Sequence, residues 1–166
     1  MIHVVTGDLA SVAADAVVRP ATTTLDLMDP ALRSLDAAAG PRFIEQRRLS
    51  RELVAGAAVV TGAGDLMAEF VIHAILGQTA EAITADTVRR AVDAALWQCT
   101  QWQLGTIACP ALGAPTLSAT ESAAVVLPLV REHLRVADHP TTVLIVLTDP
   151  RDEETFTARL GQGGSA

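Results

Sequence analysis

The stretch VVRPATTTLDLMDPALRSLDAAAGP, residues 17–41, decides the fold of this chain. It opens with an apolar segment that a proline interrupts, runs through three threonines, and closes on Gly40-Pro41, a typical stop for a helix. Apolar residues recur at helical spacing just before that stop. The stretch therefore predicts a strand, a loop over residues 22–30 and a helix over residues 31–39.

Outside this stretch, strand-like and helix-like segments alternate along the chain. Short runs rich in β-branched residues predict six strands in total, at residues 2–6, 16–19, 57–61, 70–76, 106–109 and 141–147. Helical spacing predicts further helices at residues 43–53, 85–103 and 118–134, the last kinked by Pro128, with a final turn at 156–160. This alternation predicts a three-layer α/β sandwich with its ligand loops beyond the strand ends.

The composition indicates one domain without a metal site or cofactor. We expect a single domain over residues 1–160 and a flexible tail over 161–166. No apolar run approaches the roughly 18 residues of a membrane span, and no export signal precedes the first strand, so we expect a cytoplasmic protein without a membrane partner. Cys99 and Cys109 lack the spacing of a zinc site and are expected to be buried thiols.

The charge argues against a nucleic-acid partner. The formal net charge is -7, and all 12 basic residues are arginines. Binding to a phosphate backbone requires clustered basic residues, and the densest cluster here is short: Arg42, Arg47, Arg48 and Arg51. A solvated helix face is the preferred interpretation of this cluster, and an anion site is the alternative.

Several segments together resemble the macro domain, the family that holds ADP-ribose and includes Appr-1-p processing proteins. Besides the opening stretch, segments 57–66, 70–74, 89–95 and 107–113 fall in the order and spacing of that family. The resemblance implies an α/β/α sandwich with a mixed central sheet of about six strands. It also implies a ligand cleft across the strand ends.

The resemblance implies which residues would surround a ligand. In macro domains an acidic residue reads the adenine amino group, glycine loops surround the diphosphate, and an aromatic residue packs on the base. Asp8 stands at the adenine-reading position, and a plain helix cap is the alternative interpretation of this residue. The implied ligand-binding set is Asp8, Leu9, Thr22, Gly113, Ala114, Thr116, Leu117, Ser118 and Thr148.

The phosphate loops depart from the family pattern. Where the family has a glycine run, this chain has Leu27, Met28, Asp29 and Pro30. A nest of converging N–H groups needs positive φ angles, and a proline donates nothing. Leu27 and Met28 are expected to cover the pocket from within, with a new apolar ligand site as the alternative. The second loop is also shorter, although the free N–H groups where the Ser118 helix begins could still attract an anion.

No catalytic residue is identified. The chain contains no asparagine, and Thr22 replaces the one that holds the distal ribose and supports hydrolysis in the family. The threonines are interpreted as turn and cap residues. Arg19 is expected to form an internal ion pair with Asp8, Asp26 or Asp29. His73 is expected to be a hydrogen-bonded core residue.

Three functions remain open from the sequence. The first is a binding module with a degenerate pocket and weak or altered affinity for ADP-ribose or a related nucleotide. The second, ranked lower, is an ADP-ribosyl hydrolase. The third is a ligand-free structural or protein-interaction domain whose partner the sequence does not identify.

Overall fold

The six apolar segments form one mixed β-sheet. The computed structural model describes residues 1–163, and its strands are β1 (Ile2–Thr6), β2 (Ala16–Thr22), β3 (Ala58–Gly62), β4 (Phe70–Gly77), β5 (Thr106–Cys109) and β6 (Thr142–Leu147). Their order in the sheet is β1-β6-β5-β2-β4-β3. Every neighbouring pair is parallel except β3 and β4, which are antiparallel. The carboxyl ends of the five parallel strands therefore lie along one edge of the sheet.

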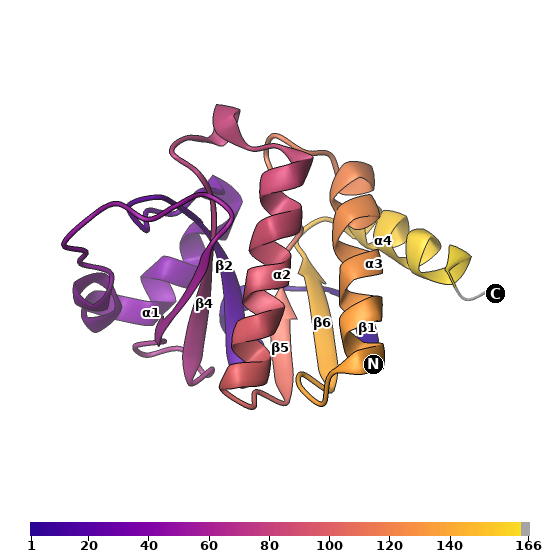
Figure 1. Ribbon diagram of the computed structural model, residues 1–166, viewed down its shortest axis with the longest axis horizontal. Helices are drawn as coiled ribbons and strands as arrows, with labels where there is room; N and C mark the ends of the chain where they lie inside the picture. Colours follow the sequence, from indigo (N-terminus) through magenta and orange to yellow (C-terminus); the bar gives the residue numbers. More distant parts are fainter. Residues whose placement is uncertain (164–166) are drawn as a thin grey trace.

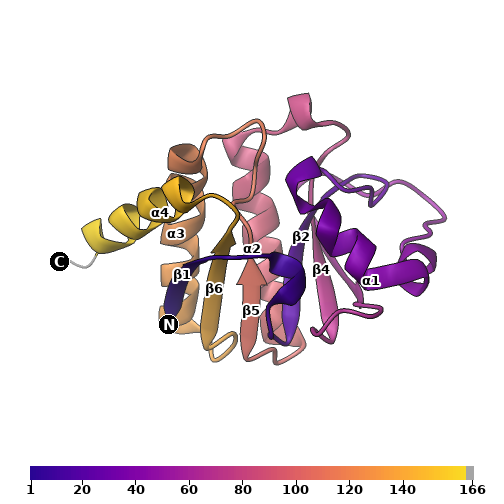
Figure 2. The ribbon, with the colours of Figure 1, turned by 180° about the vertical axis from the view of Figure 1, so that it is seen from behind.

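Helices cover both faces of this sheet, as Figures 1 and 2 show from opposite sides. The helices α2 (Ala85–Gln101) and α3 (Ala119–Val136) cover one face, and α1 (Arg33–Gln46) covers the other. Neighbouring residues of β2 belong to different cores, Val18 to the α2–α3 side and Val17 to the α1 side, because successive strand residues point to opposite faces. The predicted three-layer α/β/α sandwich is confirmed.

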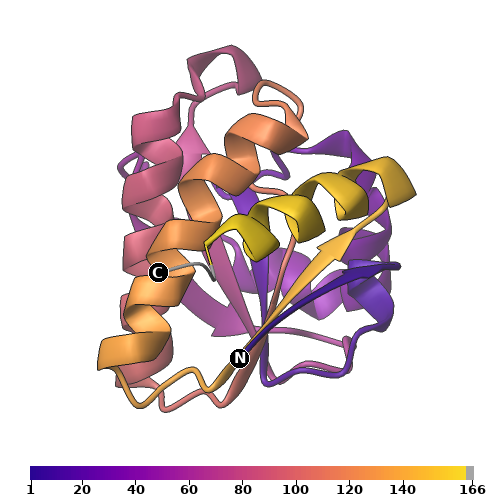
Figure 3. The same cartoon turned by 90° about the vertical axis from the view of Figure 1, so that its right-hand side faces the viewer.

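The last helix, α4 (Pro150–Gln162), begins earlier than the turn expected at 156–160. Asp149 caps it and Pro150 occupies its first turn, two signals of a helix start. It packs against α3 and β1, as the view in Figure 3 shows. The helix extends into the expected tail, and residues 164–166 lie outside the described part of the chain.

One further helix prediction needs correction. The helix expected at 43–53 ends at Gln46, because the backbone N–H groups of Leu53 and Gly56 instead donate to the carbonyls of Thr23 and Ile75. This ties the segment to the ends of β2 and β4. The α3 helix continues through Pro128 to Val136, and Pro128 itself is exposed. Within residues 1–163, no helix is long and apolar enough to cross a membrane.

Two glycines offer a matched test of the packing. Gly64, in the turn between β3 and β4, has a φ of +58°, and a Cβ there would lie 2.1 Å from the carbonyl oxygen of Ala39. Gly64→Ala is expected to lower the free energy of unfolding by about 2 kcal/mol, because both the clash and the φ are unfavourable. Gly161 lies in α4, and apart from its chain neighbours and the backbone of its own helix no atom lies within 4 Å of its Cβ position. Gly161→Ala is expected to leave stability unchanged or raise it by up to about 1 kcal/mol. Urea denaturation measures both, and equal effects would contradict this account of Gly64.

Candidate functional site

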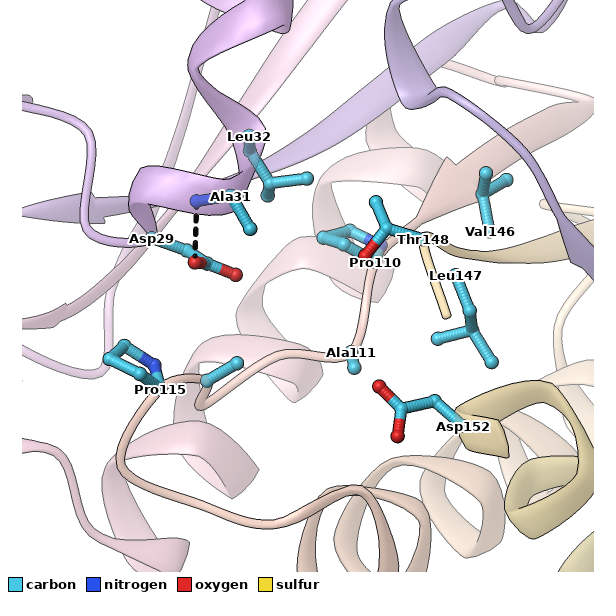
Figure 4. A pocket seen from close by; sticks show the side chains of 11 residues that line it. Asp29, Ala31, Leu32, Pro110, Ala111, Pro115, Val146, Leu147, Thr148 and Asp152 are labelled. Carbon is cyan, nitrogen blue, oxygen red and sulfur yellow. Dashed lines mark hydrogen bonds between the residues drawn. The ribbon is translucent and has the colours of Figure 1, made fainter. Parts of the chain in front are cut away.

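A cavity of about 230 Å³ lies beyond the carboxyl ends of β5 and β6. Three segments form its wall: the start of α1 with the loop before it, the loop after β5, and the end of β6 with the first turn of α4 (Figure 4). Its lining residues are Asp29, Ala31, Leu32, Pro110, Ala111, Ala114, Pro115, Val146, Leu147, Thr148 and Asp152. The cavity therefore lies at the edge where an α/β sheet of this kind binds its ligands.

The polar groups of this cavity are mainly acidic. Asp29 caps the short 3₁₀ helix η2 (Pro30–Leu32), where its Oδ1 accepts from the N–H of Ala31 at 3.0 Å. Asp152 comes from the first turn of α4, and the two carboxylates point into the cavity from opposite sides (Figure 4). Among the described residues, no arginine or histidine lines this cavity. Its electrostatic character is therefore negative.

Ala114 and Thr148 are the two predicted ligand residues that line the cavity. Asp8 does not line the cavity, but it follows Gly7, whose N–H donates at 2.8 Å to the carbonyl of the lining residue Leu147. The Oδ1 of Asp8 accepts from the N–H of Ala10 at 2.9 Å and from the hydroxyl of Ser34 at 3.1 Å. Asp8 thus caps the 3₁₀ helix η1 (Leu9–Ser11), as one interpretation of the sequence expected.

Two other predicted residues lie in different surroundings. Leu9 is only 2% exposed and packs in the core on the α1 side of the sheet. The hydroxyl of Thr22 accepts from the N–H groups of Thr24 at 3.3 Å and Asp26 at 3.1 Å. The interpretation of the threonines as turn residues is confirmed for Thr22, and neither residue lines the cavity.

The remaining predicted residues hold the second loop together. Gly113 is buried with a φ of +101°, and a Cβ there would lie 2.7 Å from Cδ1 of Leu117. The hydroxyl of Thr116 donates to the carbonyl of Ala80 at 2.6 Å. The N–H of Ser118, expected to be free for an anion, instead donates to the carboxylate of Glu121 at 2.8 Å. The capping box at the start of α3 uses this donor and the N–H of Glu121, so fewer free donors remain there for an anion than the sequence suggested.

Leu27 and Met28, which replace part of the family's glycine run, do not line the cavity. Met28 is buried in the core on the α2–α3 side, and Leu27 packs partly buried on the α1 side. They fill the two cores around the loop, so neither the expectation that they cover the pocket from within nor the alternative of a new apolar ligand site at these two residues finds support.

The comparison with known proteins identifies the family of this chain. The family profile described as Macro domain matches residues 18–125. The chain belongs to the macro domain family. Two curated relatives also match, and the chain spans about half the length of each. A protein of Aeropyrum pernix is 34% identical over 109 residues, which cover 65% of this chain and 58% of that protein. An O-acetyl-ADP-ribose deacetylase of Citrobacter rodentium is 40% identical over 78 residues, or 45% of this chain and 44% of that one.

Solved structures of other macro domains share this fold. An Oceanobacillus iheyensis macrodomain with MES bound superposes with a TM-score of 0.85 at 20% identity, over 96% of this chain and 89% of that one. A Trypanosoma brucei macrodomain in complex with ADP-ribose superposes with a TM-score of 0.84 at 16% identity, over 95% of this chain and 68% of that one. At these identities the likeness establishes the fold of the macro domain, including the mixed six-stranded sheet.

A buried ion pair lies beneath the first loop of this macro domain. Arg19 of β2 is 0% exposed, and its Nε and Nη2 donate to the two carboxylate oxygens of Asp36, each at 2.7 Å. Asp8, Asp26 and Asp29, the partners expected for Arg19, instead accept hydrogen bonds within their own turns. The expected internal ion pair exists, but its partner comes from α1, which lies over β2.

Further groups extend this ion pair into a network. Arg47 lies 3.2 Å from Asp36, and both guanidinium groups donate to the carbonyl of Leu25 at 2.9 and 3.0 Å. His73 of β4 lies 3.3 Å from Nη1 of Arg19, and its Nε2 lies 2.8 Å from the hydroxyl of Thr61. Burial, with the nearby charges of Arg19 and Arg47, lowers the pKa of His73 to about 3. His73 is therefore a neutral, hydrogen-bonded core residue, as predicted.

Both cysteines are buried thiols, which confirms the prediction. Burial raises the pKa of each thiol to about 12, and the neighbouring Cys99 also raises the pKa of Cys109. Thiols with such pKa values stay protonated at neutral pH and are poor nucleophiles. No cluster of three or more metal-binding side chains occurs within residues 1–163.

Proposed function

We propose that this macro domain is a binding module without hydrolytic activity, which holds ADP-ribose or a related nucleotide weakly in the cavity beyond β5 and β6. The observation that carries this proposal is the cavity itself. It lies at the carboxyl edge of the sheet, Ala114 and Thr148 line it, and Asp8 lies beside it. In the Trypanosoma brucei macrodomain the ligand named in the solved complex is ADP-ribose.

The end of the cavity near Asp8 suits an adenine base. Oδ1 of Asp8 takes two hydrogen bonds, whereas Oδ2 has no hydrogen-bond partner among residues 1–163. An amino group could donate to this second oxygen while the first continues to cap η1. Leu32, Val146 and Leu147 supply an apolar wall for a flat ring.

Weak affinity follows from what the cavity lacks. In the loop over residues 22–30, the N–H groups of Thr22, Thr23, Leu25 and Met28 already donate to backbone carbonyls, so they are not free to hold a diphosphate. No asparagine is available to position the distal ribose, and Thr22 is engaged in its own turn. Because of these losses, we rank hydrolysis as a less well supported function than binding. Among the predicted ligand residues, we propose Asp8, Ala114 and Thr148 for direct contact.

Calorimetric titration of the purified protein with ADP-ribose tests this function. We expect a dissociation constant on the order of 0.1 mM. Asp8→Ser keeps a side chain that can cap η1 but is too short to reach a base, and it should weaken binding at least about fivefold. Asp138→Ala, an exposed carboxylate in the loop before β6, is the matched control and should bind like the wild type.

Two outcomes would contradict the proposal. Absence of binding at millimolar ADP-ribose and adenosine would leave a ligand-free interaction domain as the better account. Release of ADP-ribose from a modified protein or O-acetyl-ADP-ribose, detected by chromatography, would favour a hydrolase.

A further inference from the structure

We propose that this cavity selects a nucleoside without phosphate groups, so that adenosine binds more tightly than ADP-ribose. This inference rests on the proposed function and names the class of ligand. It reverses the preference expected of a pocket built around a diphosphate. Its basis is the way the chain's own carboxylates occupy the positions where an anion would lie.

The first step concerns the N–H donors at the helix starts along this edge. Free donors there would favour a phosphate, because they combine unpaired N–H groups with the positive end of the helix dipole. Asp29 accepts from Ala31 at 3.0 Å before α1, and Asp149 accepts from Arg151 at 2.9 Å at the start of α4. Glu121 accepts from the N–H of α3's capping residue at 2.8 Å. Each of these helix starts already has a negative charge of its own.

The second step concerns the charge inside the cavity. Asp29 and Asp152 face it from opposite sides, and the carboxylate of Asp152 makes no hydrogen bond or ion pair among residues 1–163. The neighbouring arginines do not neutralise the negative charges of these two carboxylates. Arg33 turns back to donate to the carbonyl of Pro30, and Arg151 is exposed and lies 3.6 Å from Asp149. A phosphate placed between these two carboxylates would be repelled without a nearby cation.

The third step concerns backbone and space. Two prolines stand where a phosphate loop would donate, Pro30 at the start of η2 and Pro115 in the cavity wall, and neither has an N–H. A volume of about 230 Å³ lies below the roughly 300–1,000 Å³ of typical sites for drug-sized ligands. The cavity thus has room for a nucleoside and lacks the donors for an attached diphosphate.

The same groups suit an uncharged ligand with several donors. Ribose hydroxyls and an exocyclic amino group donate hydrogen bonds, and ionised carboxylates only accept them. Asp29 and Asp152 can therefore bind the sugar, and Asp8 can bind the base. Hydrogen bonds to a charged acceptor are stronger than those between neutral groups.

The test is a titration of the full chain with adenosine, AMP, ADP and ADP-ribose at a fixed, physiological salt concentration. We expect adenosine to bind at least about tenfold more tightly than ADP-ribose, the scale of repulsion between nearby partly exposed charges. AMP and ADP should also bind more weakly than adenosine. Higher salt should narrow the difference, because it screens the repulsion.

Two variants and one control assign the effect to the cavity. Asp29→Asn and Asp152→Asn each remove one charge with almost no change in shape, and the amide at position 29 can still cap η2. Each should narrow the preference for adenosine over ADP-ribose by several-fold. Asp138→Asn makes the same change in net charge on the exposed loop before β6 and should leave the preference unchanged.

The outcomes separate this inference from the proposed function. If ADP-ribose binds as tightly as adenosine or more so, the selectivity is refuted while the binding function stands. If adenosine is preferred but neither cavity variant changes the ratio, the carboxylates are not its cause and the inference fails. If none of the four compounds binds, both the proposed function and this inference are refuted.

Discussion

Asp36→Ala is expected to lower the free energy of unfolding by about 3–5 kcal/mol, the usual effect of removing one partner of a buried ion pair. The substitution would leave the guanidinium of Arg19, which is 0% exposed, without a carboxylate. It would also remove the partner of Arg47, whose Nε is already a buried donor without a hydrogen-bond partner among the described residues. Urea denaturation monitored by circular dichroism measures the change.

Asp65→Ala is the matched control for this prediction. Asp65 pairs with Arg42 at 3.2 Å, but both side chains are more than half exposed, so the loss should stay below about 1 kcal/mol. The double variant Arg19→Met with Asp36→Leu should recover part of the stability, because Arg19 then leaves no unpaired charge, whereas Arg47 still loses its carboxylate partner. If Asp36→Ala lowers the free energy of unfolding no more than Asp65→Ala does, the stabilising role assigned to the buried Arg19–Asp36 network is refuted.

Acidification is expected to destabilise the fold through His73, by about 3 kcal/mol between pH 7 and pH 4. Burial first, then Arg19 and Arg47, lower the pKa of His73 from 6.5 to about 3 in the folded state. Between pH 6.5 and about pH 3, His73 is therefore protonated in the unfolded chain but stays neutral in the folded protein. Stability is retained above pH 6.5 and falls below it by about 1.4 kcal/mol per pH unit.

The change is measured as the urea midpoint at intervals from pH 7 to pH 4. His73→Gln cannot be protonated, so its stability should fall less steeply with pH than that of the wild type, whatever its stability at pH 7. The exposed His3→Gln is the control and should follow the wild-type profile. Parallel profiles for the wild type and His73→Gln would show that the folded protein accommodates the charged imidazole.

The fold could be predicted from the sequence because local signals and spacing agreed. The apolar runs at 70–76 and 141–147 became β4 and β6, and the capping box at Ser118 began α3 as predicted. The helix expected at 43–53 failed for a reason outside its own sequence, because its second half bonds to the ends of β2 and β4. Helical propensity is weak enough for such tertiary contacts to override it.

The candidate site was predictable in part. The sequence indicated that Asp29 and Pro30 are incompatible with a phosphate nest, and Asp29 does point into the cavity. It did not indicate Asp152, which no motif marks and which reaches the cavity because α4 begins at Pro150, six residues earlier than expected. The acidic first turn after Asp149 was the one signal that could have located this helix start.

The sequence by itself determined the succession of most strands and helices along the chain, the family, and the absence of glycine from residues 22–30, because each can be read without knowing how the segments pack. Only the tertiary structure decided which distant charges meet. Arg19 pairs with Asp36 because α1 lies over β2, and Asp29 faces Asp152 because the loop before α1 and the start of α4 meet at one edge of the sheet. Charges interact through space over a few ångströms, so their partners depend on the packing of the layers.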